Sequence, residues 1–274
     1  MDAHSPPLTA GNISRPTPSR ARAAVASPAL PMPDPDGFRT ESKAVRESRT
    51  ASNFDDFTPN ERSEPASRIF NFVVALLLLV VASPVMLFTA IVIRLTSRGP
   101  IFYTQTRVGL DRRWNRTRAL RERRSEDLGG SPFTIYKFRS MRVDAEANGQ
   151  AVWAQKEDDR VTFVGKVIRK TRADELPQFL NVLRGEMNIV GPRPERPSIF
   201  VRLRESIETY PIRQRVKPGI TGLAQINNSY DSCLDDVRRK VDYDLQYLRK
   251  QCIAEDLRIM ILTVPVMVFR IGAH

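Results

Sequence analysis

Histidine and cysteine are scarce in this sequence of 274 residues. The two histidines, His4 and His274, lie at opposite ends, so we expect no histidine general base, no Ser-His-Asp triad and no histidine metal site. The two cysteines, Cys233 and Cys252, have neither metal-ligand spacing nor a disulfide framework, and we expect reduced thiols. The glycine fingerprints of P-loop and Rossmann nucleotide cradles are also missing. Catalysis must therefore rest on carboxylate, lysine, arginine or tyrosine side chains.

Large apolar side chains are rare in residues 1–66, which are rich in proline, serine, alanine and charge. Such a segment buries too little apolar surface to offset chain entropy, so we predict a disordered arm over residues 1–66. The first 68 residues hold nine basic and nine acidic side chains, and the formal charge of +12 therefore belongs to the rest of the chain. That excess requires an anionic neighbour, which is nucleic acid, lipid headgroups or a phosphorylated substrate.

A run of 25 residues without a charge extends from Ile69 to Ile93. As a helix it would be about 37 Å long, enough to cross a bilayer core of about 30 Å. We therefore predict a membrane helix over residues 67–96. Ser83 and Pro84 lie near its middle, where proline removes a backbone donor and bends a helix. The residues alone are compatible both with a kinked span and with a helix that re-enters and leaves by the same face.

The segment after this run indicates an orientation. Residues 94–127 carry ten arginines against four acidic side chains. A basic juxtamembrane cluster suits the anionic cytoplasmic leaflet. We therefore expect the rest of the protein to lie on the cytoplasmic side of a bacterial inner membrane.

Residues 97–274 have the pattern of a mixed α/β domain in which helices dominate. Residues 101–108 and 133–138 are rich in aromatic and β-branched side chains and are predicted strands. Helices are predicted over 174–184, ending at Gly185, and from residue 235 or 236 to about 250. The apolar residues 259–269 are too few to span a membrane. They are expected to lie on the membrane or pack against the first helix; a buried core helix is the alternative.

Several polar clusters suggest phosphate handling. Guanidinium groups match phosphate oxygens in pairs, lysine acts as a point charge, and a helix N-terminus adds N–H donors. Asp174 and Glu175 begin a predicted helix, where a carboxylate can hold a divalent cation or attack phosphorus. An acidic pair in that position is also an ordinary helix cap. The basic side chains near such clusters are Lys137 and Arg139 on a strand, Arg169 before the acidic pair, Arg193 between two prolines, and Lys217 in a glycine-bearing turn.

Four ordered sequence blocks resemble the bacterial sugar transferase family, the monotopic polyprenyl-phosphate hexose-1-phosphate transferases. The blocks are GPIFYTQTRVG, FTIYKFRSM followed by DAE, ADELPQFLNVLRGEMNIVGPRP, and KPGITGLAQIN. The tail, VRRKVDYDLQYLRK with the short apolar segment, is similar to the exopolysaccharide-type branch. The resemblance implies a re-entrant helix broken at Ser83 and Pro84, together with interfacial amphipathic helices.

The resemblance also implies a reaction. Asp174 would attack the sugar-bearing phosphorus of a UDP-sugar, with Glu175 completing the dyad, and polyprenyl phosphate would then accept the phosphosugar from the aspartyl intermediate. Mg²⁺ would lie beside Asp174 and the diphosphate. The product would begin exopolysaccharide or other glycoconjugate synthesis. Substrate and phosphate binding are assigned to Lys137, Arg139, Arg169, Arg193, Pro194, Lys217 and Gln225.

Other functions remain open from the sequence. A membrane-tethered nucleic-acid-binding or scaffold protein would use the arginines of residues 94–124, but it leaves the DELPQ and GPRP blocks unexplained. We therefore expect no nucleic-acid partner. A second alternative is an enzyme of the same fold that acts on another lipid or donor. The sugar, the oligomeric state (a homo-oligomer included) and the role of residues 111–130 are not fixed by the sequence.

Overall fold

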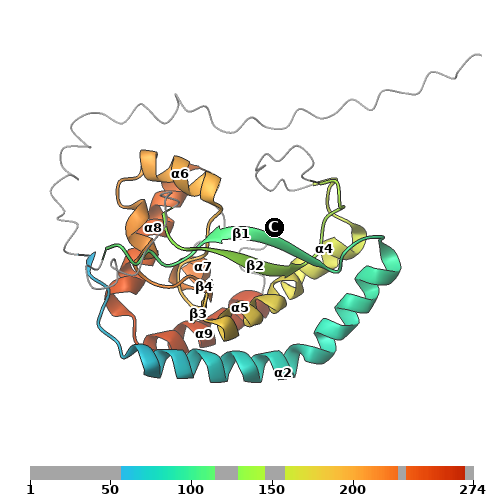
Figure 1. Ribbon diagram of the computed structural model, residues 1–274, viewed down its shortest axis with the longest axis horizontal. Helices are drawn as coiled ribbons and strands as arrows, with labels where there is room; N and C mark the ends of the chain where they lie inside the picture. Colours follow the sequence, from blue (N-terminus) through green and yellow to red (C-terminus); the bar gives the residue numbers. More distant parts are fainter. Residues whose placement is uncertain (1–56, 115–128, 146–157, 228–232, 269–274) are drawn as a thin grey trace, which may run out of the picture. The chain divides into compact units, whose positions relative to one another are not determined.

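The computed structural model describes residues 57–114, 129–145, 158–227 and 233–268. These ranges are mostly helical, as predicted, and contain two separate pairs of strands (Figure 1). Most of the predicted arm and of the 111–130 loop lies outside them. The elements in chain order are α2 (Glu64–Thr96), β1 (Phe102–Val108), β2 (Pro132–Phe138), α4 (Phe163–Lys170), η3 (Ala173–Gln178), α5 (Phe179–Arg184), β3 (Asn188–Val190), α6 (Pro197–Ser206), η4 (Tyr210–Arg215), β4 (Gly219–Thr221), α7 (Leu223–Asn227), α8 (Leu234–Lys250) and α9 (Ile253–Val268).

The long apolar helix α2 begins at Glu64, three residues before its predicted start. The Ser63 hydroxyl caps it by accepting from the Ala66 N–H at 3.5 Å, and Pro65 occupies the first turn, where its missing N–H costs nothing. The preceding residues 57–63, part of the predicted arm, contact the helices that end the chain: the Asn60 N–H donates to the Leu248 carbonyl at 2.9 Å. This hydrogen bond holds the segment before α2 against the end of α8.

One narrow stripe of α2 faces the domain. Its buried residues are Ser67, Asn71, Ala75, Thr89 and Ile93, spaced by four within each half of the helix. Most of the large apolar side chains on the other faces are exposed, Val81 at 75% and Phe88 at 68%. A soluble domain rarely exposes so continuous an apolar surface, so α2 has the length and surface of a membrane-associated helix.

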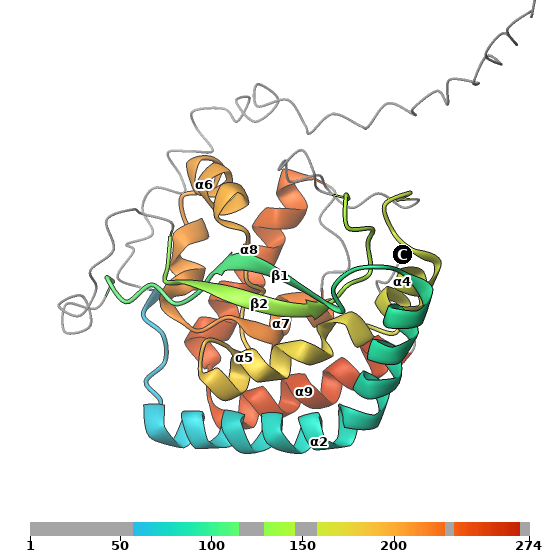
Figure 2. The same ribbon diagram turned by 45° about the vertical axis from the view of Figure 1, so that its right-hand side comes forward.

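The helix bends in its middle, and Figures 1 and 2 show its second half rising away from the line of the first. Pro84 has no N–H to donate to the Val80 carbonyl four residues earlier. The Ser83 hydroxyl donates to that carbonyl instead, at 2.7 Å, which compensates the lost hydrogen bond. After the bend, Ile93 joins a small core with Phe138 and Ile168. Serine and proline together therefore allow a bend without an unsatisfied carbonyl.

The predicted strands form an antiparallel hairpin, within one residue of the expected bounds. In its register Lys137 lies opposite Tyr103, and Phe133 lies opposite Arg107. Opposite residues share a face, so Tyr103, Arg107 and Lys137 line the same side of the hairpin. The second pair, β3 and β4, is parallel, with Asn188 opposite Gly219. Just after β3 the chain turns back, and the Pro192 carbonyl accepts from the Gly219 N–H at the start of β4, at 2.9 Å.

The C-terminal helices close the main core. Helix α8 buries Val241, Leu245 and Leu248. Helix α9 lies alongside α2 in both ribbon views and buries Ile259 completely. Its other side leaves Ile261 69% and Val264 60% exposed. The alternative of a fully buried helix over 259–269 is therefore wrong, and α9 is apolar on both its packed and its open side.

Candidate active site

The acidic pair lies in the first turn of η3, the short 3₁₀ helix after α4. The turn between the two helices passes through Arg172, whose φ of 53° is left-handed, an uncommon conformation for a residue with a side chain. Successive side chains in a 3₁₀ helix diverge by about 120°. Asp174 and Glu175 therefore reach different surroundings although they are adjacent in the chain.

Glu175 is held by two cations. Its Oε1 atom accepts from Lys137 Nζ at 3.0 Å and from Arg193 Nη2 at 2.6 Å, and its side chain is only 11% exposed. Burial alone would raise the pKa of Glu175, but the charges of Arg193 and Lys137 outweigh it and hold that pKa well below its usual range. Glu175 is therefore an ionised carboxylate that two cations hold through one of its oxygens.

Asp174 is held much more loosely. Its nearest cation is Lys137, with 3.8 Å between Nζ and Oδ2, beyond hydrogen-bonding distance. Within the described ranges its carboxylate accepts no hydrogen bond. Burial raises the pKa of Asp174, against the lowering effect of Lys137. An ionised carboxylate that is poorly solvated and only weakly paired is a better nucleophile than one held by short hydrogen bonds.

Burial also affects the pKa values of Lys137 and Arg193, the two basic partners of Glu175. It lowers the pKa of Lys137, partly opposed by Glu175. Glu175 raises the pKa of Arg193, whose side chain remains 35% exposed and so can reach a ligand. Pro194 contributes its backbone carbonyl, which accepts a hydrogen bond from Arg107 Nη1 at 3.1 Å.

Arg107 is a residue that the sequence interpretation missed. It lies on the hairpin face shared with Lys137, its Nη1 atom is 3.6 Å from the Glu195 carboxylate, and its Nε–H has no partner among the described residues. Burial lowers the pKa of Arg107, and the charge of Arg193 acts in the same direction. Strand alternation in FYTQTRV places Tyr103, Gln105 and Arg107 on one side, and that signal could have found it.

The remaining predicted basic residues divide into two groups. Arg169 lies near the acidic pair. Its charge opposes the rise in the pKa of Asp174 that burial causes, and its Nε–H donates to the Ser140 hydroxyl at 3.0 Å. Arg139 is engaged elsewhere, because its guanidinium donates to the Ser97 and Arg98 carbonyls, each at 3.0 Å, at the end of α2. A phosphate-binding role for Arg139 stays a prediction without support from this geometry.

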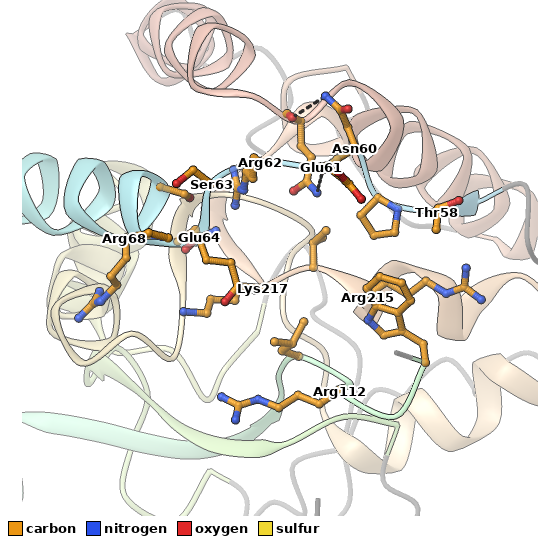
Figure 3. A pocket seen from close by; sticks show the side chains of 18 residues that line it. Thr58, Asn60, Glu61, Arg62, Ser63, Glu64, Arg68, Arg112, Arg215 and Lys217 are labelled. Carbon is orange, nitrogen blue, oxygen red and sulfur yellow. Dashed lines mark hydrogen bonds between the residues drawn. The ribbon is translucent and has the colours of Figure 1, made fainter. Parts of the chain in front are cut away.

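Lys217 and Gln225 are not brought to the acidic pair. Lys217 lines a cavity of about 1580 Å³ near the start of α2, together with Arg68, Arg112 and Arg215 (Figure 3). Gln225 donates to the Ile220 carbonyl at 2.8 Å and stabilises its own turn. Their assigned roles in substrate binding remain predictions.

The same residues limit how a divalent cation could be held. In the described part of the chain no group of three or more histidine, cysteine, aspartate or glutamate side chains could form a metal cage. Glu175 is occupied by its cations, which leaves the Asp174 carboxylate as the available ligand. Mg²⁺ commonly binds through one or two carboxylates completed by water and substrate phosphates, so this donor set fits Mg²⁺ only when a phosphorylated substrate is present.

The chain is similar to proteins of known function. A family model described as bacterial sugar transferase matches residues 62–270. A UDP-glucose:undecaprenyl-phosphate glucose-1-phosphate transferase of Klebsiella pneumoniae is 41% identical over 199 residues, which are 72% of this chain and 39% of that protein. A UDP-N-acetylgalactosamine-undecaprenyl-phosphate N-acetylgalactosaminephosphotransferase of Aeromonas hydrophila is 41% identical over 192 residues, 70% of this chain and 41% of that protein.

A shorter relative is matched over more of its length. A UDP-glucose:undecaprenyl-phosphate glucose-1-phosphate transferase of Caulobacter vibrioides is 36% identical over 200 residues, 72% of this chain and 68% of that protein. The chain thus spans about two fifths of the two longer relatives and about two thirds of this one.

Proposed function

The chain belongs to the bacterial sugar transferase family, and we propose that it transfers a hexose-1-phosphate from a UDP-sugar to polyprenyl phosphate, with undecaprenyl phosphate as the carrier. The relatives named above act on UDP-glucose or UDP-N-acetylgalactosamine with undecaprenyl phosphate. The observation that carries the proposal is the unequal pairing of the acidic residues: Glu175 is held by Lys137 and Arg193, while Asp174 accepts no hydrogen bond among the described residues.

In the proposed first half-reaction an Asp174 carboxylate oxygen forms a bond to the β-phosphorus of the donor. The bond from that phosphorus to the bridging oxygen breaks, and UMP leaves with the electron pair. In the second half-reaction an oxygen of polyprenyl phosphate attacks the same phosphorus and releases the Asp174 carboxylate. The raised pKa of Asp174 favours attack once the group is ionised, because a more basic carboxylate is more nucleophilic.

The basic side chains have separate tasks in this proposal. Lys137 and Arg193 keep Glu175 ionised and oriented, and the exposed part of Arg193 is available to diphosphate oxygens. Arg107 and Arg169 add positive charge beside the developing negative charge. Asp174 would hold Mg²⁺ together with the diphosphate, and the ion would neutralise phosphate charge when bound.

We also propose that α2 is re-entrant. Both of its ends contact the same domain. Near the start, Arg68 donates to the Val182 carbonyl at 2.6 Å and Asn71 accepts from the Ile189 N–H at 2.7 Å. At the far end, Arg139 donates to the carbonyls of Ser97 and Arg98, the two residues that follow the helix. A domain on one side of a bilayer can hold both ends only if the helix returns to that side, and the bend at Pro84 allows this.

Charge and apolar exposure support a cytoplasmic placement of the domain at an inner membrane. Arg94 and Arg98 lie at the end of α2 and suit the anionic cytoplasmic leaflet of a bacterial inner membrane. The open apolar side of α9 would rest at the lipid interface beside α2. The acidic pair would then face the cytoplasm near the headgroups, where a polyprenyl phosphate presents its phosphate. The product would begin an exopolysaccharide or another glycoconjugate.

The reaction is tested by UMP release from a panel of UDP-sugars, with purified protein, undecaprenyl phosphate and Mg²⁺ in detergent. We expect release with at least one donor, dependent on the lipid, and the active donor identifies the sugar. Absence of release with every donor, from folded protein, would contradict the proposed function.

A further inference from the structure

The turn that carries Arg193 is held by its carbonyl groups. Residues 191–197, GPRPERP, contain three prolines that have no N–H to donate. Four successive carbonyls accept hydrogen bonds from three segments, β4, η4 and β1: Pro192 from the Gly219 N–H at 2.9 Å, Arg193 from Arg213 Nη2 at 3.1 Å, Pro194 from Arg107 Nη1 at 3.1 Å, and Glu195 from the Val108 N–H at 2.8 Å. The backbone direction at Arg193 is therefore set from outside the turn.

Arg213 makes its contact with this turn from within the core. Its side chain is fully buried, and Asp244 on α8 pairs with it through Nε at 2.9 Å and Nη2 at 2.7 Å. Its Nη1 atom donates to the Tyr210 hydroxyl at 2.8 Å, and Nη2 also donates to the Arg193 carbonyl. A buried ion pair is weak evidence for stability, because desolvation of the two charges offsets their attraction. The contact with Arg193 gives this pair a second role.

We propose that Arg213, oriented by Asp244, is a positioning residue that fixes the Arg193 backbone and thereby aims the Arg193 guanidinium at Glu175. The connection runs from α8 through η4 to the turn after β3 and ends at the acidic pair. Among the described residues, Arg213 makes no hydrogen bond or ion pair with Asp174 or Glu175, and it acts only through Arg193. The catalytic meaning of this connection rests on the proposed transferase function.

Lysine cannot replace Arg213 in this arrangement. The guanidinium reaches a carboxylate, a hydroxyl and a carbonyl in three directions of one plane, whereas an ammonium group at the end of a flexible stem cannot reach all three. Arg213→Lys keeps the charge that neutralises Asp244 and removes the fixed geometry. Tyr210→Phe is the matched control, because it deletes one hydrogen bond of the same buried side chain and leaves the bond to Arg193.

The kinetic test is a double-mutant cycle. Displacement of a positioned group by about 1 Å costs on the order of 100-fold in rate, so we expect Arg213→Lys to lower kcat/KM for the donor by about 100-fold. In an Arg193→Ala background the same substitution should have little further effect, because its route to the site is already lost. An equal loss in both backgrounds would mean that Arg213 has only a structural role and would overturn the proposal.

A second readout does not depend on turnover. Hydrogen–deuterium exchange of the peptide covering residues 188–197 should be faster in Arg213→Lys than in wild type. In Tyr210→Phe the same peptide should exchange at close to the wild-type rate. The peptide covering residues 234–250 should exchange at close to the wild-type rate in both variants. Unchanged exchange in residues 188–197 would overturn the proposal.

If Arg213→Lys does not fold, Asp244→Asn replaces it as the test variant, since this change keeps the volume of the Asp244 side chain and weakens its hydrogen bonds to Arg213. If wild type releases UMP from no donor, the proposed function fails, and the exchange result still decides whether Arg213 holds the turn.

Discussion

Glu175 and Asp174 are neighbours in the chain, but they are paired to very different extents. The same oxygen of Glu175 accepts from both Lys137 and Arg193, whereas Asp174 lies 3.8 Å from Lys137 and accepts no hydrogen bond in the described ranges. The two carboxylates consequently have opposite pKa shifts, raised for Asp174 by burial and lowered for Glu175 by its cations. Opposite shifts in adjacent acids indicate different roles, one as a nucleophile and one as a fixed anion.

This difference predicts a pH dependence. Asp174 must be ionised to attack, so the rate should fall with decreasing pH through a pKa above the ordinary aspartate value of 3.8. Lys137 lowers that pKa, and Lys137→Met removes its charge. We therefore expect the acid limb of the pH profile of kcat/KM for the donor to move to higher pH in Lys137→Met, together with a lower maximum.

The control for this shift is Lys166→Met. Lys166 is exposed on α4, and its charge is not among the main causes of the Asp174 shift. We expect its acid limb to coincide with that of wild type. An acid limb that stays in place, or moves to lower pH, in Lys137→Met would show that the titrating group is not Asp174 beside Lys137.

Asn71 supports a prediction about stability. It is 1% exposed within the apolar helix, and its side-chain oxygen accepts from the Ile189 N–H at 2.7 Å. Asn71→Leu keeps the branched shape and the number of side-chain heavy atoms but leaves that N–H buried without a partner, which costs about 1–3 kcal/mol. We expect a lower thermal unfolding midpoint in detergent. Thr96→Val, an exposed change in the same helix, should leave the midpoint near wild type; equal midpoints for Asn71→Leu and wild type would contradict the contact.

The bend in α2 predicts a change of topology. Replacing Ser83 and Pro84 together by leucine restores the backbone donor for the Val80 carbonyl and should straighten the helix. We expect the first residues of the chain to move across the membrane. A cysteine introduced within residues 1–56, after Cys233 and Cys252 are changed to serine, would then react with an impermeant maleimide from the periplasmic side. Ser83→Leu alone keeps the proline and should keep the wild-type labelling, and unchanged labelling of the double variant would refute re-entry.

Local patterns predicted the regular elements well. The hairpin, the helix ending at Gly185 and helix α8 follow directly from strand alternation, a C-terminal glycine and helical periodicity. The first part of the helix expected over 174–184 is 3₁₀ instead of α-helical, over Ala173–Gln178, and Pro177, which has no N–H to donate, lies within that part. The pair β3 and β4 has three residues in each strand, too few for a periodic pattern to show.

Contacts distant in sequence were harder to predict. Strand alternation would let Lys137 and Arg139 face one side. However, β2 ends at Phe138, and the Arg139 guanidinium donates to the Arg98 carbonyl just after α2. No local pattern marks Asn71 within its apolar run, because its partner Ile189 is 118 positions away. The buried ion pair of Arg213 and Asp244 likewise joins η4 to α8, and no local spacing indicates it.

Asp174 is the proposed nucleophile, and trapping of the covalent intermediate tests this assignment most directly. Purified protein is mixed, without lipid acceptor, with a UDP-sugar radiolabelled in either its β- or its α-phosphate. We expect the β-label to remain on the protein, on the peptide that contains Asp174, and to be discharged by undecaprenyl phosphate. The α-label should leave with UMP. Asp174→Asn should retain no label, while Asp235→Asn, a change on the exposed first turn of α8, should retain it. Label on another residue, or label retained by Asp174→Asn, would contradict the central claim.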